Sequence, residues 1–127
     1  MLRLARERGE VKVVDSEFVT PTSTSELAQQ IVRLSRSNSY GLYHATAEGS
    51  CSWYEFAREI FAMTNTPVRL NVAGPYEFPA KVPRPKYSVL ENAALTSRGL
   101  NTFEPWKVGL HIYLGNRIKS ASTQMST

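Results

Sequence analysis

Apolar residues recur at helical spacing in two stretches of the chain. Leu27, Ile31 and Leu34 form one stripe, with Ala28 and Val32 beside it. The second stripe follows the i, i+3, i+4, i+7, i+8 pattern and comprises Trp53, Phe56, Ala57, Ile60 and Phe61. Each pattern predicts an amphipathic helix that buries its apolar face against the rest of the protein.

Both stripes are preceded by the signature of a capping box. Ser23 lies three residues before Glu26, and Ser52 lies three residues before Glu55. In this motif the serine hydroxyl and the glutamate carboxylate each accept a hydrogen bond from the other residue's backbone amide. We therefore expect the two helices to begin at these serines.

Short runs rich in β-branched and aromatic residues predict strands between the helices. These runs are Val11–Asp15, Tyr40–Thr46 and Val68–Val72. Phe18–Thr22 surrounds Pro21 and predicts a loop instead.

Glycine and proline predict the limits of the remaining helices. A helix over Met1–Arg8 should end at Gly9, and one over Asn92–Arg98 should end at Gly99, because glycine readily adopts the left-handed conformation found there. Pro105 suits the first turn of a last helix. The apolar face of that helix comprises Trp106, Leu110, Tyr113 and Leu114.

Two further segments favour irregular structure. Gly74–Pro85 is rich in proline, which fixes φ and removes amide donors, so we expect a structured loop. Residues 118–127 are mostly small and polar, and we expect a flexible tail that leaves residues 1–117 as one domain. The order of helices and strands predicts an α/β fold.

Composition places the chain among ordinary globular proteins. Its 127 residues suit one domain, with 42% apolar and 20% charged residues. The net charge of +4 comes from scattered lysines and arginines, without the basic run that favours nucleic-acid binding. Cys51 is the only cysteine, which fits a reducing cytoplasm, and no apolar stretch reaches the roughly 18 residues of a membrane-spanning helix.

The sequence contains none of the motifs that would supply catalysis. It has no G-x-G-x-x-G turn for a dinucleotide, and none of its tyrosines is followed four residues later by a lysine. His44 and His111 are far apart and share no pattern with cysteines or carboxylates, so a zinc site is not expected. We interpret His44 and Cys51 as structural, and we predict no catalytic, cofactor-binding or metal-binding residue.

Arg84 is the one residue that the spacing marks for a ligand. It lies between Pro83 and Pro85, which restrict the backbone and could hold its guanidinium in place. A guanidinium binds phosphate oxygens in a bidentate manner. The alternative is an ordinary exposed arginine in a loop.

Several motifs resemble the dTDP-4-dehydrorhamnose reductase family. Val13–Thr22 reads V-V-D-S-E-F-V-T-P-T and is similar to the family's V-V-D-D-Q-x-G-S-P-T. The likeness continues through Gly41–Thr46 and Gly49–Ala57. Arg84–Asn92 reads R-P-K-Y-S-V-L-E-N and is similar to the family's R-P-x-x-S-x-L-x-N. The motifs run in family order from about residue 1 to residue 115.

The family consists of extended short-chain dehydrogenases/reductases. Its Rossmann half carries the cofactor glycines and a Tyr/Lys pair, and its carboxy-terminal half closes over the nucleotide sugar. The resemblance therefore implies the carboxy-terminal substrate-binding part, made of short strands with flanking helices, with the Rossmann half missing. It implies NADP or NAD in the complete enzyme and neither bound by this chain alone. The expected partners are a dTDP-linked deoxyhexose and the missing Rossmann half. The resemblance leaves a homodimer open, and we expect no nucleic-acid or membrane partner.

The resemblance also implies substrate-binding roles for Arg84 and Glu17. Arg84 would contact the phosphates, at the rim of an apolar patch exposed by the missing half. Glu17 stands where the family usually has glutamine, and its carboxylate, an acceptor only, would repel a diphosphate. Val19 replaces a usual glycine and Ser16 a usual aspartate.

Three interpretations follow from these residues. The first is the substrate-binding half of an NAD(P)-dependent reductase of dTDP-L-rhamnose biosynthesis, which is not catalytic alone. The second is a non-catalytic regulatory or interaction module, since relatives of the family include a regulatory subunit of methionine adenosyltransferase. The third is a truncated fragment without independent function.

Overall fold

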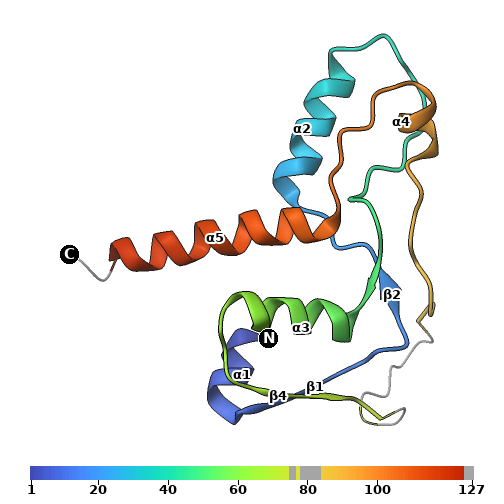
Figure 1. Cartoon of the computed structure of the whole chain (residues 1–127). Coiled ribbons are helices and arrows are strands. Elements are labelled where there is room, and N and C mark those ends of the chain that lie inside the picture. The colour runs from blue at the N-terminus through green and yellow to red at the C-terminus, as the bar shows by residue number, and fades with distance from the viewer. Residues whose placement is uncertain (75–76, 78–83, 125–127) are drawn as a thin grey trace. The chain divides into compact units, whose positions relative to one another are not determined.

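In the computed structural model of the chain, the described residues are 1–74, 77 and 84–124, with side chains described as far as residue 117. They belong to two compact units (Figure 1). The first unit combines Met1–Val19 with Cys51–Ser88, and the second combines Thr20–Ser50 with Val89–Thr127. Most of the predicted proline-rich loop lies outside the described residues.

The first unit is built on a pair of parallel strands. β1 (Glu10–Val13) pairs with β4 (Arg69–Val72) in a two-stranded sheet. α1 (Leu2–Arg8) precedes β1, and α3 (Trp53–Met63) precedes β4 in the chain. Parallel strands need a long crossover connection, and α3 lies within it. The predicted first and third strands and the predicted first helix are therefore confirmed.

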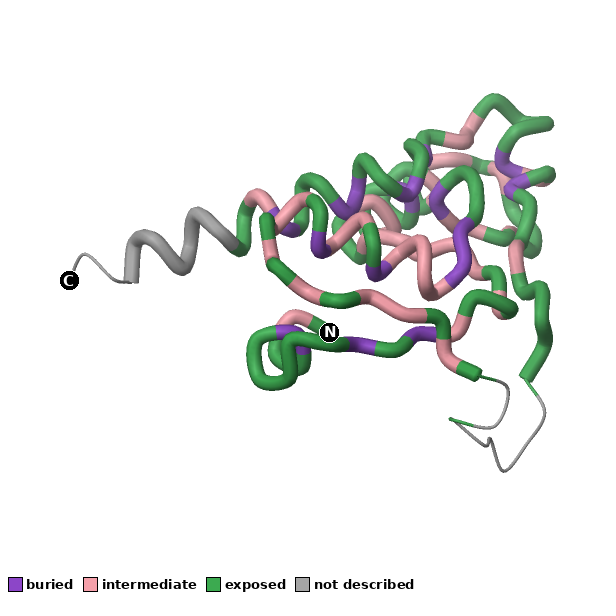
Figure 2. Tube along the Cα trace, turned by 60° about the horizontal axis from the view of Figure 1, so that its bottom comes forward, coloured by how far each residue is buried: buried purple, intermediate pink, exposed green. Residues whose placement is uncertain are grey.

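The core of the first unit joins α1, β1 and α3. Its buried members are Ala5, Val11, Val13, Ala57 and Phe61 (Figure 2). Along β1, exposed and buried residues alternate, so that Glu10 and Lys12 are exposed. This alternation follows from the two-residue period of a strand. Val11 and Val13 therefore contribute to the core, whereas Lys12 does not.

A complete capping box begins α3, as the sequence predicts. The Ser52 amide donates to Glu55 Oε2 at 2.8 Å, and the Glu55 amide donates to Ser52 Oγ at 3.1 Å. The apolar face is less buried than expected, because Trp53, Phe56 and Ile60 are only half-buried. The centre of the face lies at the buried Ala57 and Phe61 that follow Phe56 and Ile60 in the chain.

Two very short strands replace part of a predicted loop. β2 (Phe18–Val19) pairs antiparallel with β3 (Cys51–Ser52). The loop predicted over Phe18–Thr22 is therefore wrong at its first two residues. Strands of two residues are too short to show an alternating pattern in the sequence, so only their distant partners reveal them.

The second unit contains three helices joined by extended segments. They are α2 (Thr24–Ser35), α4 (Ala93–Ser97) and α5 (Trp106–Gln124). Gly99, with φ of 64°, follows α4 as predicted. α5 begins directly after Pro105, also as predicted. Its backbone is helical as far as Gln124, within the segment where we expect a flexible tail, and residues 125–127 lie outside the described part.

The apolar face of α5 needs one correction. Trp106, Leu110 and Leu114 are buried as predicted, but Tyr113 is 56% exposed. Successive residues of a helix point about 100° apart, so Tyr113 cannot share the centre of a face with Leu114. Its hydroxyl instead accepts a hydrogen bond from Arg117 at 3.0 Å.

α2 differs from its prediction at both its cap and its buried face. Ser23 occupies the cap position, yet its hydroxyl bonds to Ser25 and makes no capping bond. Ile31 is 56% exposed, and the fully buried residue of this helix is Gln30. The apolar stripe therefore does not mark the inward face. The buried face is set instead by Gln30, whose amide binds a neighbouring backbone.

The predicted strand over Tyr40–Thr46 is not a strand in the structure. Its last residue pairs with a side chain instead, since the Thr46 amide donates to Asn92 Oδ1 at 3.0 Å and the Thr46 carbonyl accepts from Asn92 Nδ2 at 2.7 Å. Asn92 is 3% exposed. A buried amide therefore supplies the donor and acceptor that a neighbouring strand would otherwise provide.

The two glycines of α5 lie in different surroundings and should respond oppositely to alanine. A Cβ on Gly109 would lie 2.5 Å from Glu26 Oε2 and 3.0 Å from the Cβ of Ser23, whereas a Cβ on Gly115 would meet nothing within 4 Å. We expect Gly115→Ala to stabilise the fold by up to about 1 kcal/mol through helix propensity. Gly109→Ala should be less stable than Gly115→Ala by about 1 kcal/mol, because turning the Glu26 carboxylate away leaves the contact with the Cβ of Ser23.

Urea unfolding followed by circular dichroism measures both changes in the free energy of unfolding. The two substitutions alter the same helix in the same way, so the difference between them isolates the contact of α2 with Gly109. Equal free energies of unfolding would contradict this packing.

Candidate ligand site

Glu17 and Arg84 line the same hollow in the first unit. The hollow has a volume of about 610 Å³. The other residues that line it are Met1, Leu4, Val11, Lys12, Val13, Val14, Trp53 and Glu77. The two residues marked by the sequence therefore lie on one hollow, although they are far apart in the chain.

Hydrogen bonds between backbones bring the segments of Glu17 and Arg84 together. The Phe18 amide donates to the Lys86 carbonyl at 2.8 Å, and the Ser88 amide donates to the Phe18 carbonyl at 3.0 Å. Phe18 directly follows Glu17, and Lys86 lies two residues after Arg84. These hydrogen bonds hold the two backbone segments that carry the candidate residues side by side. Arg84 is exposed and Glu17 is half-buried.

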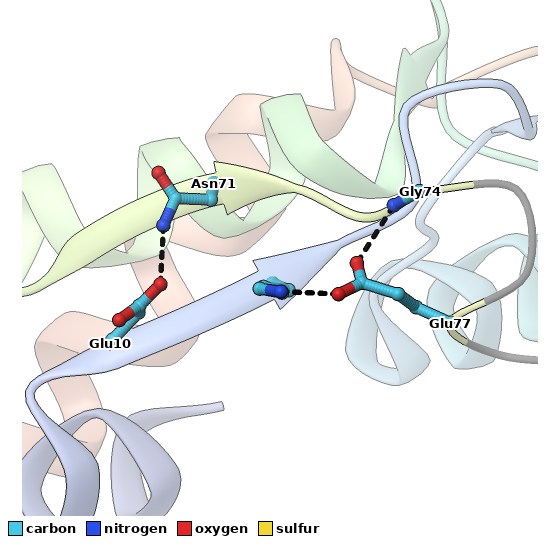
Figure 3. Close-up of polar contacts among 5 residues, drawn as sticks. Glu10, Asn71, Gly74 and Glu77 are labelled. Carbon is cyan, nitrogen blue, oxygen red and sulfur yellow. Dashed lines mark hydrogen bonds and ion pairs between the residues drawn. The ribbon is translucent and has the colours of Figure 1, made fainter.

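Lys12 and Glu77 add an ion pair to the hollow that the sequence did not indicate. The Lys12 ammonium donates to Glu77 Oε1, and Glu77 Oε2 accepts from the Gly74 amide at 2.8 Å (Figure 3). The hydrogen bond to Glu77 raises the pKa of Lys12 above its ordinary value. The hydrogen bond from Lys12, helped by Gly74, lowers the pKa of Glu77. Both groups are therefore charged at neutral pH.

Part of the hollow's lining is apolar. Met1 and Leu4, which are 42% and 37% exposed, line the hollow together with Arg84. Trp53 packs edge-on against Phe56, with ring centroids 6.2 Å apart. Cationic groups beside apolar side chains suit a ligand that carries both an anionic group and an organic ring.

An exposed aromatic pair lies on the segments that carry Glu17 and Arg84. The rings of Phe18 and Tyr87 have centroids 6.4 Å apart and are 38% and 66% exposed. Neither residue lines the hollow.

The remaining candidates from the sequence do not line the hollow. Cys51 is 2% exposed and His44 is exposed in the second unit. Within the described ranges, no group of three or more His, Cys, Asp or Glu residues could hold a metal ion. Nor is any helix there both long and apolar enough to cross a membrane.

The junction between β3 and α3 does not fit the pyrophosphate of a dinucleotide cofactor. Such a cofactor needs a glycine-rich turn between a strand and a helix, whose amides face the phosphates. Where β3 leads into α3, the chain has Ser52 in place of glycines, and the Glu55 carboxylate already accepts a hydrogen bond from the Ser52 amide. A phosphate there would meet a negative charge.

Comparison with known proteins agrees with this fold. The family model of the RmlD substrate binding domain matches residues 1–118. The chain belongs to this family. The resemblance to dTDP-4-dehydrorhamnose reductases and the predicted mixed α/β fold are both confirmed.

Relatives of this RmlD substrate-binding domain include two bacterial proteins. The spore coat polysaccharide biosynthesis protein SpsK of Bacillus subtilis is 36% identical over 117 residues, which are 92% of this chain and 41% of that protein. The dTDP-4-keto-6-deoxy-D-glucose reductase of Streptomyces niveus is 36% identical over 111 residues, 87% of this chain and 38% of that protein.

A solved structure gives the same result. The dTDP-4-dehydrorhamnose reductase of Bacillus anthracis, in complex with NADP, superposes with a TM-score of 0.85 at 36% identity. The match covers 91% of this chain and 41% of that one. The RmlD domain thus spans about two fifths of the length of the relatives that it matches.

Proposed function

We propose that this RmlD domain binds a dTDP-linked deoxyhexose in the hollow of the first unit, with Arg84 contacting the diphosphate. The observation that carries the proposal is that Arg84 and Glu17, the two residues marked by the family motifs, line one hollow. Arginine is suited to this role because its planar guanidinium matches two phosphate oxygens at once. The names of the relatives, which are dTDP-sugar reductases, support the same ligand class.

In this proposal the domain contributes recognition and does not supply the hydride or the proton. We assign the NADP of the family's reductases to residues outside this chain, because the strand–helix junction at Ser52 does not fit a pyrophosphate. We place the protein in the cytoplasm, where its single cysteine would stay reduced.

The proposal is tested by titrating the ¹⁵N-labelled protein with dTDP-rhamnose. The two indole signals, from Trp53 and Trp106, serve as internal reporters because only Trp53 lines the hollow. We expect the Trp53 signal to shift in a saturable manner while that of Trp106 stays. Binding should be weak, since a single wall leaves much of the ligand in water.

Arg84→Ala should weaken this binding about tenfold, the effect of losing a charged hydrogen bond. Arg58→Ala is the matched control, because Arg58 is exposed on α3 and does not line the hollow. If neither indole signal shifts, or if both variants bind as the unchanged protein does, the proposed function is wrong. The interaction-module interpretation, which the Glu17 carboxylate favours, would then take its place.

A further inference from the structure

Lys12 is a cation of the hollow that the proposed function does not yet use. It is the exposed residue between the buried Val11 and Val13 on β1, so its side chain leaves the strand on the face opposite the core. It lines the hollow together with Arg84. Its side chain is 46% exposed, which leaves its ammonium within reach of a ligand.

Glu77 forms an ion pair with Lys12 in the structure. One carboxylate oxygen accepts from Lys12, and the other accepts from the Gly74 amide (Figure 3). Gly74 follows β4, which is held beside β1 by the parallel pairing of Val13 with Val72. The strand pair therefore sets the separation that Glu77 bridges.

The Glu77 carboxylate can be replaced by another anion at Lys12. The two side chains are 46% and 37% exposed, and exposed ion pairs contribute little to stability. Glu10, the other carboxylate that acts on Lys12, is hydrogen-bonded to Asn71 at 2.6 Å. Glu77 is thus the group that directly competes with an incoming anion for Lys12.

The charges that line the hollow balance one another. Lys12 and Arg84 carry two positive charges, and Glu17 and Glu77 carry two negative charges. A diphosphate that entered this arrangement unchanged would meet no excess of positive charge. Moving the Glu77 carboxylate away would free Lys12 and give the diphosphate two cations against the single carboxylate of Glu17.

We propose that Lys12 is the second diphosphate-binding cation of the hollow and that Glu77 holds it until the ligand displaces the carboxylate. This inference rests on the proposed function and adds to it a binding residue and a built-in competitor. It predicts that the two residues act as a unit. Removing Glu77 should strengthen binding only while Lys12 is present.

The test uses Lys12→Met, Glu77→Gln and the double variant in the complete chain, titrated with dTDP-rhamnose and with inorganic pyrophosphate. We expect Lys12→Met to weaken binding of both probes about tenfold. Glu77→Gln should tighten binding several-fold, and this gain should vanish in the double variant. Arg58→Ala and Glu91→Gln make the same changes in net charge outside the hollow and should have no effect.

The Gly74 amide gives a second readout that does not depend on affinity. Its proton is hydrogen-bonded to the Glu77 carboxylate, so its chemical shift reports whether that carboxylate is in place. Ligand binding to the unchanged protein should move the Gly74 signal toward its position in Glu77→Ala, because glutamine would still offer the amide an acceptor oxygen. A structural salt bridge that only holds the turn at Gly74 would leave the signal unmoved by ligand.

The outcomes separate this inference from the proposed function. Binding that depends on Arg84 but is unaffected by Lys12→Met and Glu77→Gln would overturn the inference and leave the proposed function standing. Tighter binding by Glu77→Gln even without Lys12 would also overturn it, because general charge repulsion would then explain the gain. Absence of Arg84-dependent binding in every variant would overturn both.

Discussion

Phe61→Ala is expected to lower the free energy of unfolding by about 3–5 kcal/mol, the range found for large buried aromatic residues. Phe61 is 6% exposed and belongs to the cluster that joins α1, β1 and α3. Alanine would remove most of the ring's burial and leave a cavity in this cluster. Because a small protein is stable by only about 5–15 kcal/mol, the variant should be close to unfolding.

Phe18→Ala is the matched control, since it removes the same side chain from the same unit. Phe18 is 38% exposed, and its ring lies near that of Tyr87. The free energy of unfolding should fall by about 1 kcal/mol for the lost aromatic pair, within the 0.5–1.5 kcal/mol range of such pairs. The lost burial of a partly exposed ring should add a modest amount. Urea unfolding at 25 °C measures both variants, and equal losses would show that the core is not centred on Phe61.

The parts of the fold that local signals describe were predictable from the sequence. The capping box of Ser52 and Glu55 specifies where α3 begins, and both of its hydrogen bonds are formed. Gly9 and Gly99, each with φ of 64°, follow α1 and α4 because glycine adopts this conformation without a Cβ clash. These features depend only on residues close together in the chain.

Pairing between distant segments was not predictable from the same patterns. β2 and β3 have two residues each, and they exist because Phe18 meets Ser52 and Val19 meets Cys51. The Tyr40–Thr46 run has strand composition, yet Thr46 bonds to the side chain of Asn92. Composition reveals the tendency to extend but not the partner that an extended segment finds.

The candidate site likewise contains residues that the sequence indicates and residues that only the structure reveals. Glu17 and Arg84 each lie within a motif of the sequence, and those motifs alone indicate both residues. Lys12 and Glu77 carry no motif, because their contact depends on the register of β1 against β4 and on the turn after Gly74. An alternating strand pattern could have marked Lys12 as a side chain facing away from the core.

Gln30 shows a further limit of the apolar pattern. It is fully buried, whereas its neighbour Gln29 is exposed. Gln30 Nε2 donates to the Leu100 carbonyl at 3.1 Å, and Gln30 Oε1 accepts from the Thr102 amide at 3.1 Å and from the Thr102 hydroxyl at 2.8 Å. The Gln30 amide thus provides hydrogen-bond partners for the backbone of a connecting segment that does not pair with a strand.

Gln30→Met should therefore destabilise the protein strongly, although methionine has a similar length and greater apolarity. The Leu100 carbonyl and the Thr102 amide would lose their partner. Each loss should cost about 1 kcal/mol, the net contribution of one hydrogen bond. Gln29→Met is the control, because the same substitution one residue earlier removes no described hydrogen bond and should change the free energy of unfolding by less than about 0.5 kcal/mol.

Urea unfolding of the two variants, together with hydrogen exchange at the Thr102 amide, distinguishes the possible outcomes. Thr102 should exchange slowly in the unchanged protein and in Gln29→Met, and much faster in Gln30→Met, because Gln30 Oε1 is the acceptor for its proton. A stable Gln30→Met variant with a protected Thr102 amide would show that apolar burial alone fixes α2 against residues 100–102. The fully buried position of Gln30 would then owe nothing to its hydrogen bonds.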